Sequence, residues 1–214
     1  MQFPDRRILI FAKAPIAGQA KTRLIPLLGA ERAALLQGEL TERAVRIAVA
    51  SQCAAVELWC APDVAAPIFN ELAARYGVSL HAQCQGDLGA RMEDAFRAAF
   101  SMARNVVIIG TDWPELSTAR IQQAFVRLME GDDAVITPTE DGGYAMLGLR
   151  QHEPHLFSNM PWSSEVVYAE TCRRLAALQL RCHAQAMSWD LDRPEDWQRA
   201  LHEGLLSEPE TIER

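Results

Sequence analysis

Residues Asn105–Pro114 read N-V-V-I-I-G-T-D-W-P, and this stretch decides the fold. Its first five residues are almost wholly apolar, which is typical of a strand buried on both faces in a parallel sheet. Residues Arg7–Ala12, R-I-L-I-F-A, form a second short run of the same kind. Because ligands bind at the carboxyl ends of the strands in such a sheet, we expect the residues that follow the two runs to be the informative ones.

Strand and helix patterns alternate along the rest of the chain. Short apolar runs predict strands, and apolar residues at helical spacing predict helices. The predicted strands cover residues 7–12, 56–60, 78–84, 105–109, 134–137, 144–149 and 181–186. The predicted helices cover residues 30–50, 64–76, 88–103, 117–129, 163–178 and 194–202. Residues 13–28, which are rich in Gly, Pro and basic side chains, are predicted to form a loop.

This alternation predicts an α/β fold with three layers, α/β/α, around a mainly parallel, Rossmann-like mixed sheet. Crossovers become fewer in the last third of the chain, which predicts antiparallel additions at one edge of the sheet. The chain has 214 residues, without an internal repeat or a clear linker. We therefore expect one domain over residues 1–214, with a polar tail at 206–214.

Composition and charge limit the classes of function. The chain is 49% hydrophobic and 23% charged, with a formal net charge of −7. Nucleic acid is a poor partner for such a chain, because no basic excess is present to bind a phosphate backbone. The N-terminal apolar run is too short to span a membrane and lacks the features of a signal peptide. We expect a cytoplasmic protein without nucleic acid or membrane as partner, and the sequence leaves its oligomeric state open.

The loop after the first strand carries residues suited to binding phosphates. Lys13, Lys21 and Arg23 supply positive charge, and Gly18 lets a ligand approach the backbone closely. The loop is not a P-loop, because Gly18 and Lys21 are separated and the G-K-[ST] pattern is absent. Solvated surface cations are the alternative interpretation, but three cations after a buried strand favour phosphate binding.

Acidic residues follow the central strand and recur near the C-terminus. Asp112 comes directly after residues 105–109, where a carboxylate suits Mg²⁺ or Mn²⁺, since such ions prefer oxygen ligands and substrate phosphates. Helix capping is the alternative role, although Ser117 is available as the cap of the next helix. Asp190 and Asp192 alternate in a second acidic segment. Either suits a second metal ligand, and the sequence does not decide between them.

Two further segments have both a structural and a functional interpretation. Residues 85–92 contain Asp87, Gly89 and Arg91 just before a predicted helix. They form a helix cap and turn, or they contact the base and ribose of a nucleotide. Residues 140–144, E-D-G-G-Y, predict either a hairpin turn or a close approach of the backbone to a ligand.

Five motifs together resemble a known family. They are F-A-K-A-P…G…K-T-R-L, G-T-D-W-P-E-L, D-G-G-Y-A-M-L-G-L, P-W-S-S and D-L-D-R-P-E-D-W. The chain resembles a bacterial family of glycosyltransferases of largely unassigned function, within the nucleotide-diphospho-sugar transferase superfamily of GT-A fold. More distantly, it is similar to phospholactate guanylyltransferase and the molybdopterin nucleotidyltransferases. The resemblance extends from Ile8 to about Trp197 and implies a GT-A fold and a transferase.

The resemblance also implies a role for each motif. The implied nucleotide-binding residues are Lys13, Gly18, Lys21, Arg23, Asp87, Gly89 and Arg91. The implied metal ligands are Asp112 and Asp192. The residues we expect on the acceptor side are Gly142, Gly143 and Tyr144, with Trp162 and Ser163 of the P-W-S-S motif. The residues we expect to act in catalysis are Lys13, Lys21, Arg23 and Asp112.

Two departures from the superfamily favour one activity over another. Trp113 and Pro114 follow Asp112, so the D-x-D motif of GT-A glycosyltransferases is absent. The glycine-rich signature of sugar-nucleotide pyrophosphorylases is replaced by the Lys13–Arg23 loop. We therefore expect Mg²⁺-dependent transfer of a nucleotidyl group from a nucleoside triphosphate to a small phosphorylated or anionic acceptor. Glycosyl transfer from a nucleotide sugar is the second interpretation, and non-catalytic nucleotide binding is the third.

Overall fold

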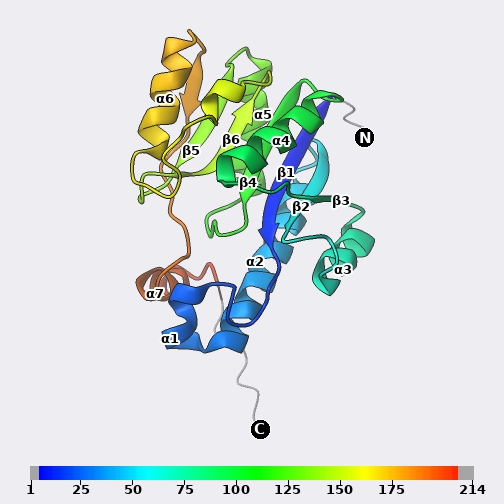
Figure 1. The fold of residues 1–214 in the computed structure, drawn as a ribbon, viewed down its shortest axis with the longest axis vertical. Helices are drawn as coiled ribbons and strands as arrows, with labels where there is room; N and C mark the ends of the chain where they lie inside the picture. The colour runs from blue at the N-terminus through cyan, green and yellow to red at the C-terminus, as the bar shows by residue number, and fades with distance from the viewer. Residues whose placement is uncertain (1–4, 207–214) are drawn as a thin grey trace.

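A seven-stranded mixed sheet forms the centre of the protein (Figure 1). The computed structural model describes residues 5–206, and the strands lie in the order β3-β2-β1-β4-β6-β5-β7. The strands are β1 (Arg6–Lys13), β2 (Ala55–Ala61), β3 (Ser79–Ala82), β4 (Asn105–Gly110), β5 (Ala134–Pro138), β6 (Tyr144–Leu149) and β7 (Cys182–Ala184). Strand β6 is antiparallel to both β4 and β5, and the other strand pairs are parallel.

Helices cover both faces of this sheet, as the sequence predicts. The helices are α1 (Ile25–Leu28), α2 (Ala30–Ala50), α3 (Pro67–Tyr76), α4 (Leu88–Phe100), α5 (Thr118–Met129), α6 (Val167–Ala177) and α7 (Pro194–His202), with 3-10 helices η1 (Thr22–Leu24) and η2 (Pro154–Leu156). Apolar side chains of α2, α3 and α5 pack on one face of the sheet. Those of α4 and α6 pack on the other. The result is the predicted three-layer α/β/α arrangement.

A third apolar cluster lies beyond the sheet, where α1 and α7 meet the first half of α2 (Figure 1). Leu24 from η1, Leu36 from α2 and Trp197 from α7 pack there with Leu191. This cluster holds the segment before α7 against the loop that follows β1. Two parts of the chain about 170 residues apart are thereby brought together at the carboxyl ends of β1 and β4.

The structure confirms that the antiparallel addition lies on one side of the sheet, where β6 is inserted between β4 and β5. It corrects two other details of the sequence prediction. The predicted loop over residues 13–28 contains η1 and α1 in its second half. Helix α6 begins at Val167 and not at Ser163, since the φ of 63° at Ser163 lies outside the helical region.

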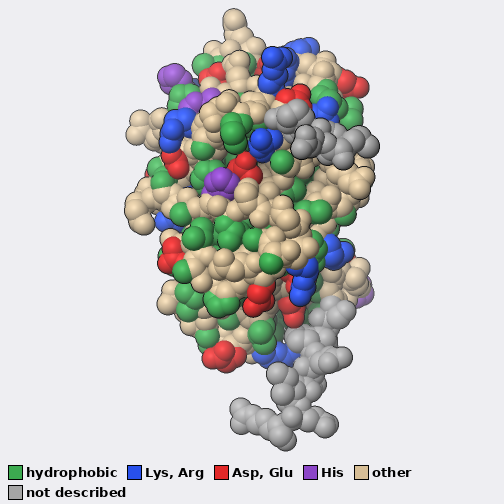
Figure 2. All heavy atoms as spheres, turned by 90° about the vertical axis from the view of Figure 1, so that its right-hand side faces the viewer, with side chains coloured by type: hydrophobic (Ala, Val, Ile, Leu, Met, Phe, Trp, Pro, Cys, Tyr) green, Lys and Arg blue, Asp and Glu red, His purple; other side chains and the backbone are tan. Residues whose placement is uncertain are grey.

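The surface carries both signs of charge. On the face shown in Figure 2, Lys and Arg side chains are interspersed with Asp and Glu and form no continuous basic patch. Within residues 5–206, no helix combines the length and the apolar character needed to cross a bilayer. The polar tail expected at residues 206–214 lies almost entirely outside the described residues.

A core substitution tests the central position of β1. Ile10 is fully buried and pairs with residues of both β2 and β4. Ile10→Ala should lower the free energy of unfolding by about 3 kcal/mol, because it removes buried methyl groups and leaves a cavity. Leu35→Ala on α2, where the leucine is 58% exposed, should change it by less than about 0.5 kcal/mol. Urea unfolding followed by circular dichroism measures both, and equal losses would contradict the central position of β1.

Candidate functional site

Two adjoining cavities open beyond the carboxyl ends of β1 and β4. The first has a volume of about 760 Å³, and Lys13, Lys21 and Arg91 are among its lining residues. The second has a volume of about 470 Å³ and is lined in part by Arg23. The residues that line both cavities are Leu88, Asp141, Tyr144, Asp190 and Asp192. Ligands in the two cavities would therefore meet beside a group of acidic side chains.

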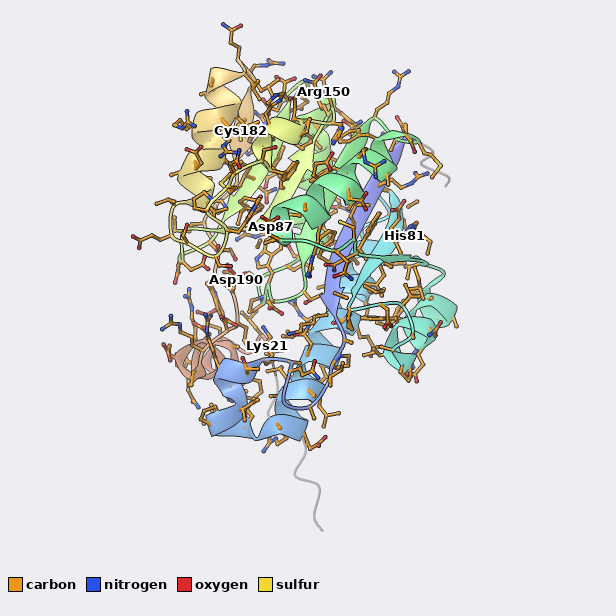
Figure 3. All side chains as sticks on the ribbon, in the orientation of Figure 1. Lys21, His81, Asp87, Arg150, Cys182 and Asp190 are labelled. Atoms are coloured by element: carbon orange, nitrogen blue, oxygen red, sulfur yellow. The ribbon has the colours of Figure 1, made fainter. Side chains whose placement is uncertain are left out.

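Lys21 connects three segments around the first cavity. Its Nζ lies 2.8 Å from Oδ2 of Asp112 and also donates a hydrogen bond to the carbonyl oxygen of Leu191. The lysine side chain is 2% exposed, whereas that of Asp112 is 42% exposed. Lys21 has a φ of 48°, so a sparsely populated backbone conformation brings its ammonium group to the site. Figure 3 shows Lys21 and Asp190 lying beyond the same end of the sheet, on different segments of the chain.

Arg23 forms an ion pair with Asp192. The sequence predicted that Lys21 and Arg23 face phosphates and that Asp112 and Asp192 face a metal ion. In the structure each of the two cations forms an ion pair with one of the two acids, and their roles toward phosphate and metal stay predictions. The reason is electrostatic, because the loop after β1 wraps over the acids and opposite charges attract strongly at such distances. Asp112 and Asp192 are therefore each balanced by a cation of the protein itself.

Asp190 is an acid of the site whose carboxyl group is largely buried. Burial, and then the negative charges of Asp141 and Asp112, raises the pKa of Asp190 to about 7. The ammonium group of Lys21 and a hydrogen bond with Thr139 oppose this shift. The sequence left open whether Asp190 or Asp192 is the second metal ligand; the charge of Asp112 contributes to the raised pKa of Asp190, and both acids line the first cavity.

The donor set fits a divalent ion that binds together with substrate. Within residues 5–206, no three His, Cys, Asp or Glu side chains are grouped to hold a metal ion by themselves. Mg²⁺ commonly uses only one or two carboxylates and completes its shell with water and substrate phosphates. Asp112 and Asp190 offer such oxygen ligands, and the negative charge that raises the pKa of Asp190 is what a cation would relieve.

The segment after β4 fixes Asp112 by burying the residue beside it. Trp113 is 1% exposed, and its Nε1 donates to Oγ of Ser188 at 2.6 Å. The guanidinium group of Arg43 donates to the carbonyl oxygen of Trp113 at 3.1 Å. The backbone N–H of Leu191 donates to the carbonyl oxygen of Asp112 at 2.8 Å. The backbone around Asp112 is thus held from both sides while its carboxylate faces the cavity.

The residues predicted to bind the nucleotide differ in their positions. Lys13 is exposed at the end of β1, and its Nζ donates to the carbonyl oxygen of Gln19 at 2.8 Å. Arg91 lines the same cavity from α4. Asp87 lines neither cavity, because its Oδ1 caps α4 by accepting from the N–H of Ala90 at 2.8 Å. The helix-cap interpretation of Asp87 therefore agrees with the structure.

The predicted glycines allow backbone conformations or close contacts that a side chain would prevent. Gly18 has a φ of 79° in the loop after β1. A Cβ on Gly89 would lie 2.3 Å from Nε1 of Trp162, so the glycine lets the indole pack against α4. A Cβ on Gly142, where φ is 86°, would lie 2.0 Å from the carbonyl oxygen of Glu165. The acceptor-side residues that line the second cavity are Gly143, Tyr144, Trp162 and Ser163.

Among the residues that line the first cavity, sequence reasoning missed the hydrogen-bonded pair of Gln37 and Thr111. Gln37 lies in α2, yet its buried side chain reaches the cavity and its Nε2 donates to Oγ1 of Thr111 at 3.1 Å. A glutamine in an amphipathic helix has no sequence signal that separates it from a surface residue. Thr111 directly precedes Asp112, and this position beside a predicted metal ligand is the one signal that the sequence offers for the pair.

A protein-family model described as "Uncharacterized protein conserved in bacteria (DUF2064)" matches residues 44–164. The chain belongs to this family. The matched region contains β4 with Asp112, the two glycines at 142 and 143, and the P-W-S-S motif. No curated protein matches the chain.

Solved structures confirm the predicted superfamily and fold. A protein from Desulfovibrio desulfuricans G20, described as a nucleotide-diphospho-sugar transferase, is 27% identical with a TM-score of 0.86, and the match covers 99% of this chain and 91% of that one. A 4-diphosphocytidyl-2C-methyl-D-erythritol synthase from Anaerococcus prevotii DSM 20548 is 10% identical with a TM-score of 0.64, over 95% and 99% of the two chains. Glucosyl-3-phosphoglycerate synthase from Mycobacterium tuberculosis, solved with Mn²⁺, UDP and glucosyl-3-phosphoglycerate, is 10% identical with a TM-score of 0.53, over 95% and 77%.

Replacing Asp190 tests the charge balance of this family member's site. The folded-state pKa of about 7 lies above the ordinary value of 3.8, so folding disfavours the ionised form. Below about pH 3 the group is protonated in both states and its ionisation costs no stability. As the pH rises from about 3 to 7 only the unfolded state ionises, so the free energy of unfolding falls and then levels off above pH 7. One pKa unit corresponds to about 1.4 kcal/mol, so in chelator at pH 8 Asp190→Asn should be more stable than wild type by up to about 4 kcal/mol.

Thermal unfolding at pH 4 and pH 8 measures this effect. Glu39→Gln, on the exposed surface of α2, is the control and should leave the pH dependence unchanged. An Asp190→Asn protein that keeps the wild-type pH dependence would contradict the assigned burial and repulsion.

Proposed function

We propose that this protein is a Mg²⁺- or Mn²⁺-dependent nucleotidyltransferase that joins a nucleoside monophosphate unit to a small phosphorylated or anionic acceptor. One observation carries the proposal: a cation-lined cavity and a second, smaller cavity adjoin at Asp190 and Asp192, beside the ion pair of Lys21 and Asp112. Two substrates that must react with each other need such a shared boundary. Two structural neighbours are named as transferases, a nucleotide-diphospho-sugar transferase and a nucleotidyl transferase, and these names support the class of reaction.

The reaction that suits this geometry is in-line attack on the α-phosphorus of a nucleoside triphosphate. An oxygen of the acceptor forms the new bond to phosphorus while the bond to the β-phosphate oxygen breaks and pyrophosphate leaves. Such a transfer requires alignment and neutralisation of charge more than acid–base chemistry. Lys13 and Lys21, which line the first cavity, would neutralise the phosphates and the leaving group.

The divalent ion would be held by Asp112 together with Asp190 or Asp192, and it would offset the charge of the phosphate oxygens. Each of these acids lines the first cavity. The ion would also offset the repulsion among Asp112, Asp141 and Asp190. The Mn²⁺ in the glucosyl-3-phosphoglycerate synthase complex supports a divalent cation on this fold.

The second cavity would hold the acceptor. Arg23 and Arg193 line it and supply positive charge for an anionic group. Trp162 and Tyr144 offer aromatic surface, and Ser163 offers a hydroxyl group. The nucleotide would occupy the first cavity, with Arg91 beside its base or ribose.

Glycosyl transfer from a nucleotide sugar is the second candidate. It is favoured by the 27% identical structure, which is described as a nucleotide-diphospho-sugar transferase. Pro114 favours nucleotidyl transfer instead, because it stands where the second acid of a D-x-D motif would follow Asp112. The two reactions release different products, so one experiment separates them.

The protein should be incubated with Mg²⁺ or Mn²⁺, a panel of small acceptors, and each nucleoside triphosphate or nucleotide sugar in turn. Our proposal requires release of pyrophosphate and a nucleotidylated acceptor. Release of a nucleoside diphosphate from a nucleotide sugar would establish glycosyl transfer, and metal-dependent binding without turnover of either donor would establish a binding protein. Asp112→Asn should lower turnover at least about 100-fold in either enzyme, because it removes charge at the reacting centre.

Lys13→Ala tests where the phosphates lie. Lys13 is exposed and contacts only a backbone carbonyl among the described residues, so its loss should not disturb the fold. A charge-assisted bond to phosphate contributes about 1.5–3 kcal/mol, so triphosphate binding should weaken at least about tenfold. Calorimetric titration should show unchanged binding of the corresponding nucleoside. Arg173→Ala, on the exposed side of α6, is the control, because it also removes one positive charge. If this control weakens triphosphate binding equally, the effect comes from net charge and not from a contact between Lys13 and phosphate.

A further inference from the structure

A chain of hydrogen bonds leads from Gln37 through Thr111 to Asp112, and each residue donates to the next. Gln37 is 4% exposed in the middle of α2, and its Nε2 lies 3.1 Å from Oγ1 of Thr111 and 3.4 Å from Oγ1 of Thr41. The hydroxyl of Thr41 donates to the carbonyl oxygen of Gln37 at 2.8 Å. Oγ1 of Thr41 can therefore only accept from the glutamine, which fixes the amide with its NH₂ group toward both threonines.

This orientation determines what Thr111 does. Its Oγ1 accepts a hydrogen bond from Gln37, so its own hydroxyl hydrogen is available for Oδ1 of Asp112, 3.2 Å away. The other carboxylate oxygen, Oδ2, lies 2.8 Å from Nζ of Lys21. Both oxygens of Asp112 are thus held, one by a neutral donor and one by a cation. The carboxylate still has 42% of its side chain exposed to accept a ligand.

We infer that Gln37 and Thr111 are positioning residues, which set the orientation of the Asp112 carboxylate toward a divalent cation and the nucleotide phosphates. Neither residue needs to touch the reacting atoms. The chain of donors from Gln37 through Thr111 restrains the rotation of the carboxylate that Lys21 alone would permit. The effect of these residues on catalysis rests on the proposed function. The orientation of the Asp112 carboxylate does not, because it is a property of the protein without ligands.

The cation affinity should depend on this chain. Partners that orient a metal-binding carboxylate typically change metal affinity or activity by about 10–100-fold when they are removed. Thr111→Val keeps the shape of the side chain and removes the donor, whereas Thr111→Ser keeps the donor. Gln37→Leu removes the amide, and Gln37→Glu places an acceptor there, so that the threonine hydroxyl turns toward the glutamate and away from Asp112.

Mn²⁺ titration followed by electron paramagnetic resonance, in the presence of the nucleoside triphosphate that binds best, measures the effect on the site. Thr111→Val, Gln37→Leu and Gln37→Glu should each weaken Mn²⁺ binding about tenfold or more, and Thr111→Ser should restore it to within about threefold of wild type. If the reaction is found, these variants should lower kcat with little change in KM for the triphosphate. Equal Mn²⁺ affinity in Thr111→Val and wild type would overturn the inference.

The buried pair of Thr137 and Gln185 provides a matched control. Thr137 donates to Oε1 of Gln185 at 2.8 Å, and neither residue lines the two cavities. Thr137→Val and Gln185→Leu should cost stability, as measured by thermal unfolding, without changing Mn²⁺ affinity. If the control pair weakens Mn²⁺ binding as much as Thr111→Val does, the effect is a general loss of packing, and the positioning role is wrong.

A measurement without any ligand separates this inference from the proposed function. Lys13 and Lys21 are the only lysines of the chain, so selective ¹⁵N-lysine labelling yields side-chain signals from the site alone. Thr111→Val should shift the Nζ signal of Lys21, because its partner Asp112 turns, and should leave that of Lys13 in place. A Lys21 signal unchanged by both Thr111→Val and Gln37→Leu overturns the positioning role whether or not the protein is a transferase. A shifted signal in a protein that binds neither Mn²⁺ nor nucleotide supports the positioning and refutes the proposed function.

Discussion

The ion pair between Lys21 and Asp112 is the contact on which the rest of the site depends. The ammonium group is almost completely buried, and it also bonds to the carbonyl oxygen of Leu191. A buried charge without its partner typically costs about 3–5 kcal/mol, so separating the three segments that carry these residues would cost free energy of that order. The pair therefore fixes the loop after β1, the turn after β4 and the segment before α7 in one arrangement. Both cavities take their shape from these segments.

The apolar cluster at the end of the sheet makes that arrangement possible. Leu24 lies three residues after Lys21, and Leu191 lies between Asp190 and Asp192. Burial of these two leucines with α2 and α7 brings the neighbouring charged residues to the cavity. Hydrophobic burial thus supplies the driving force, and the charges determine which geometry results.

The sequence predicts the position of the site better than its internal contacts. Apolar runs identify β1 and β4, and the rule that parallel strands end at one edge correctly brings Lys21 to Asp112. It does not reveal that the cation pairs with the acid, because this depends on how far the loop folds back. It also cannot place Gln37, since one turn of α2 decides whether a polar side chain meets solvent or the cavity.

The pairing of charges has a consequence for how ligands enter. Lys21 and Arg23 each already contact a carboxylate, so a triphosphate that approaches without a cation meets a site whose positive charge is largely balanced. A divalent cation on the carboxylates would shift this balance, because the acids would then be shared between the ion and the basic side chains. Each ligand would thereby lower the electrostatic cost of binding the other, and such coupling is necessarily reciprocal. Asp192 also lines the second cavity, together with Asp141 and Asp190, so an anionic acceptor there would be repelled least with the cation present. Under the proposed function, a site whose cations are already paired with its acids would bind metal, nucleotide and acceptor more tightly together than each of them alone.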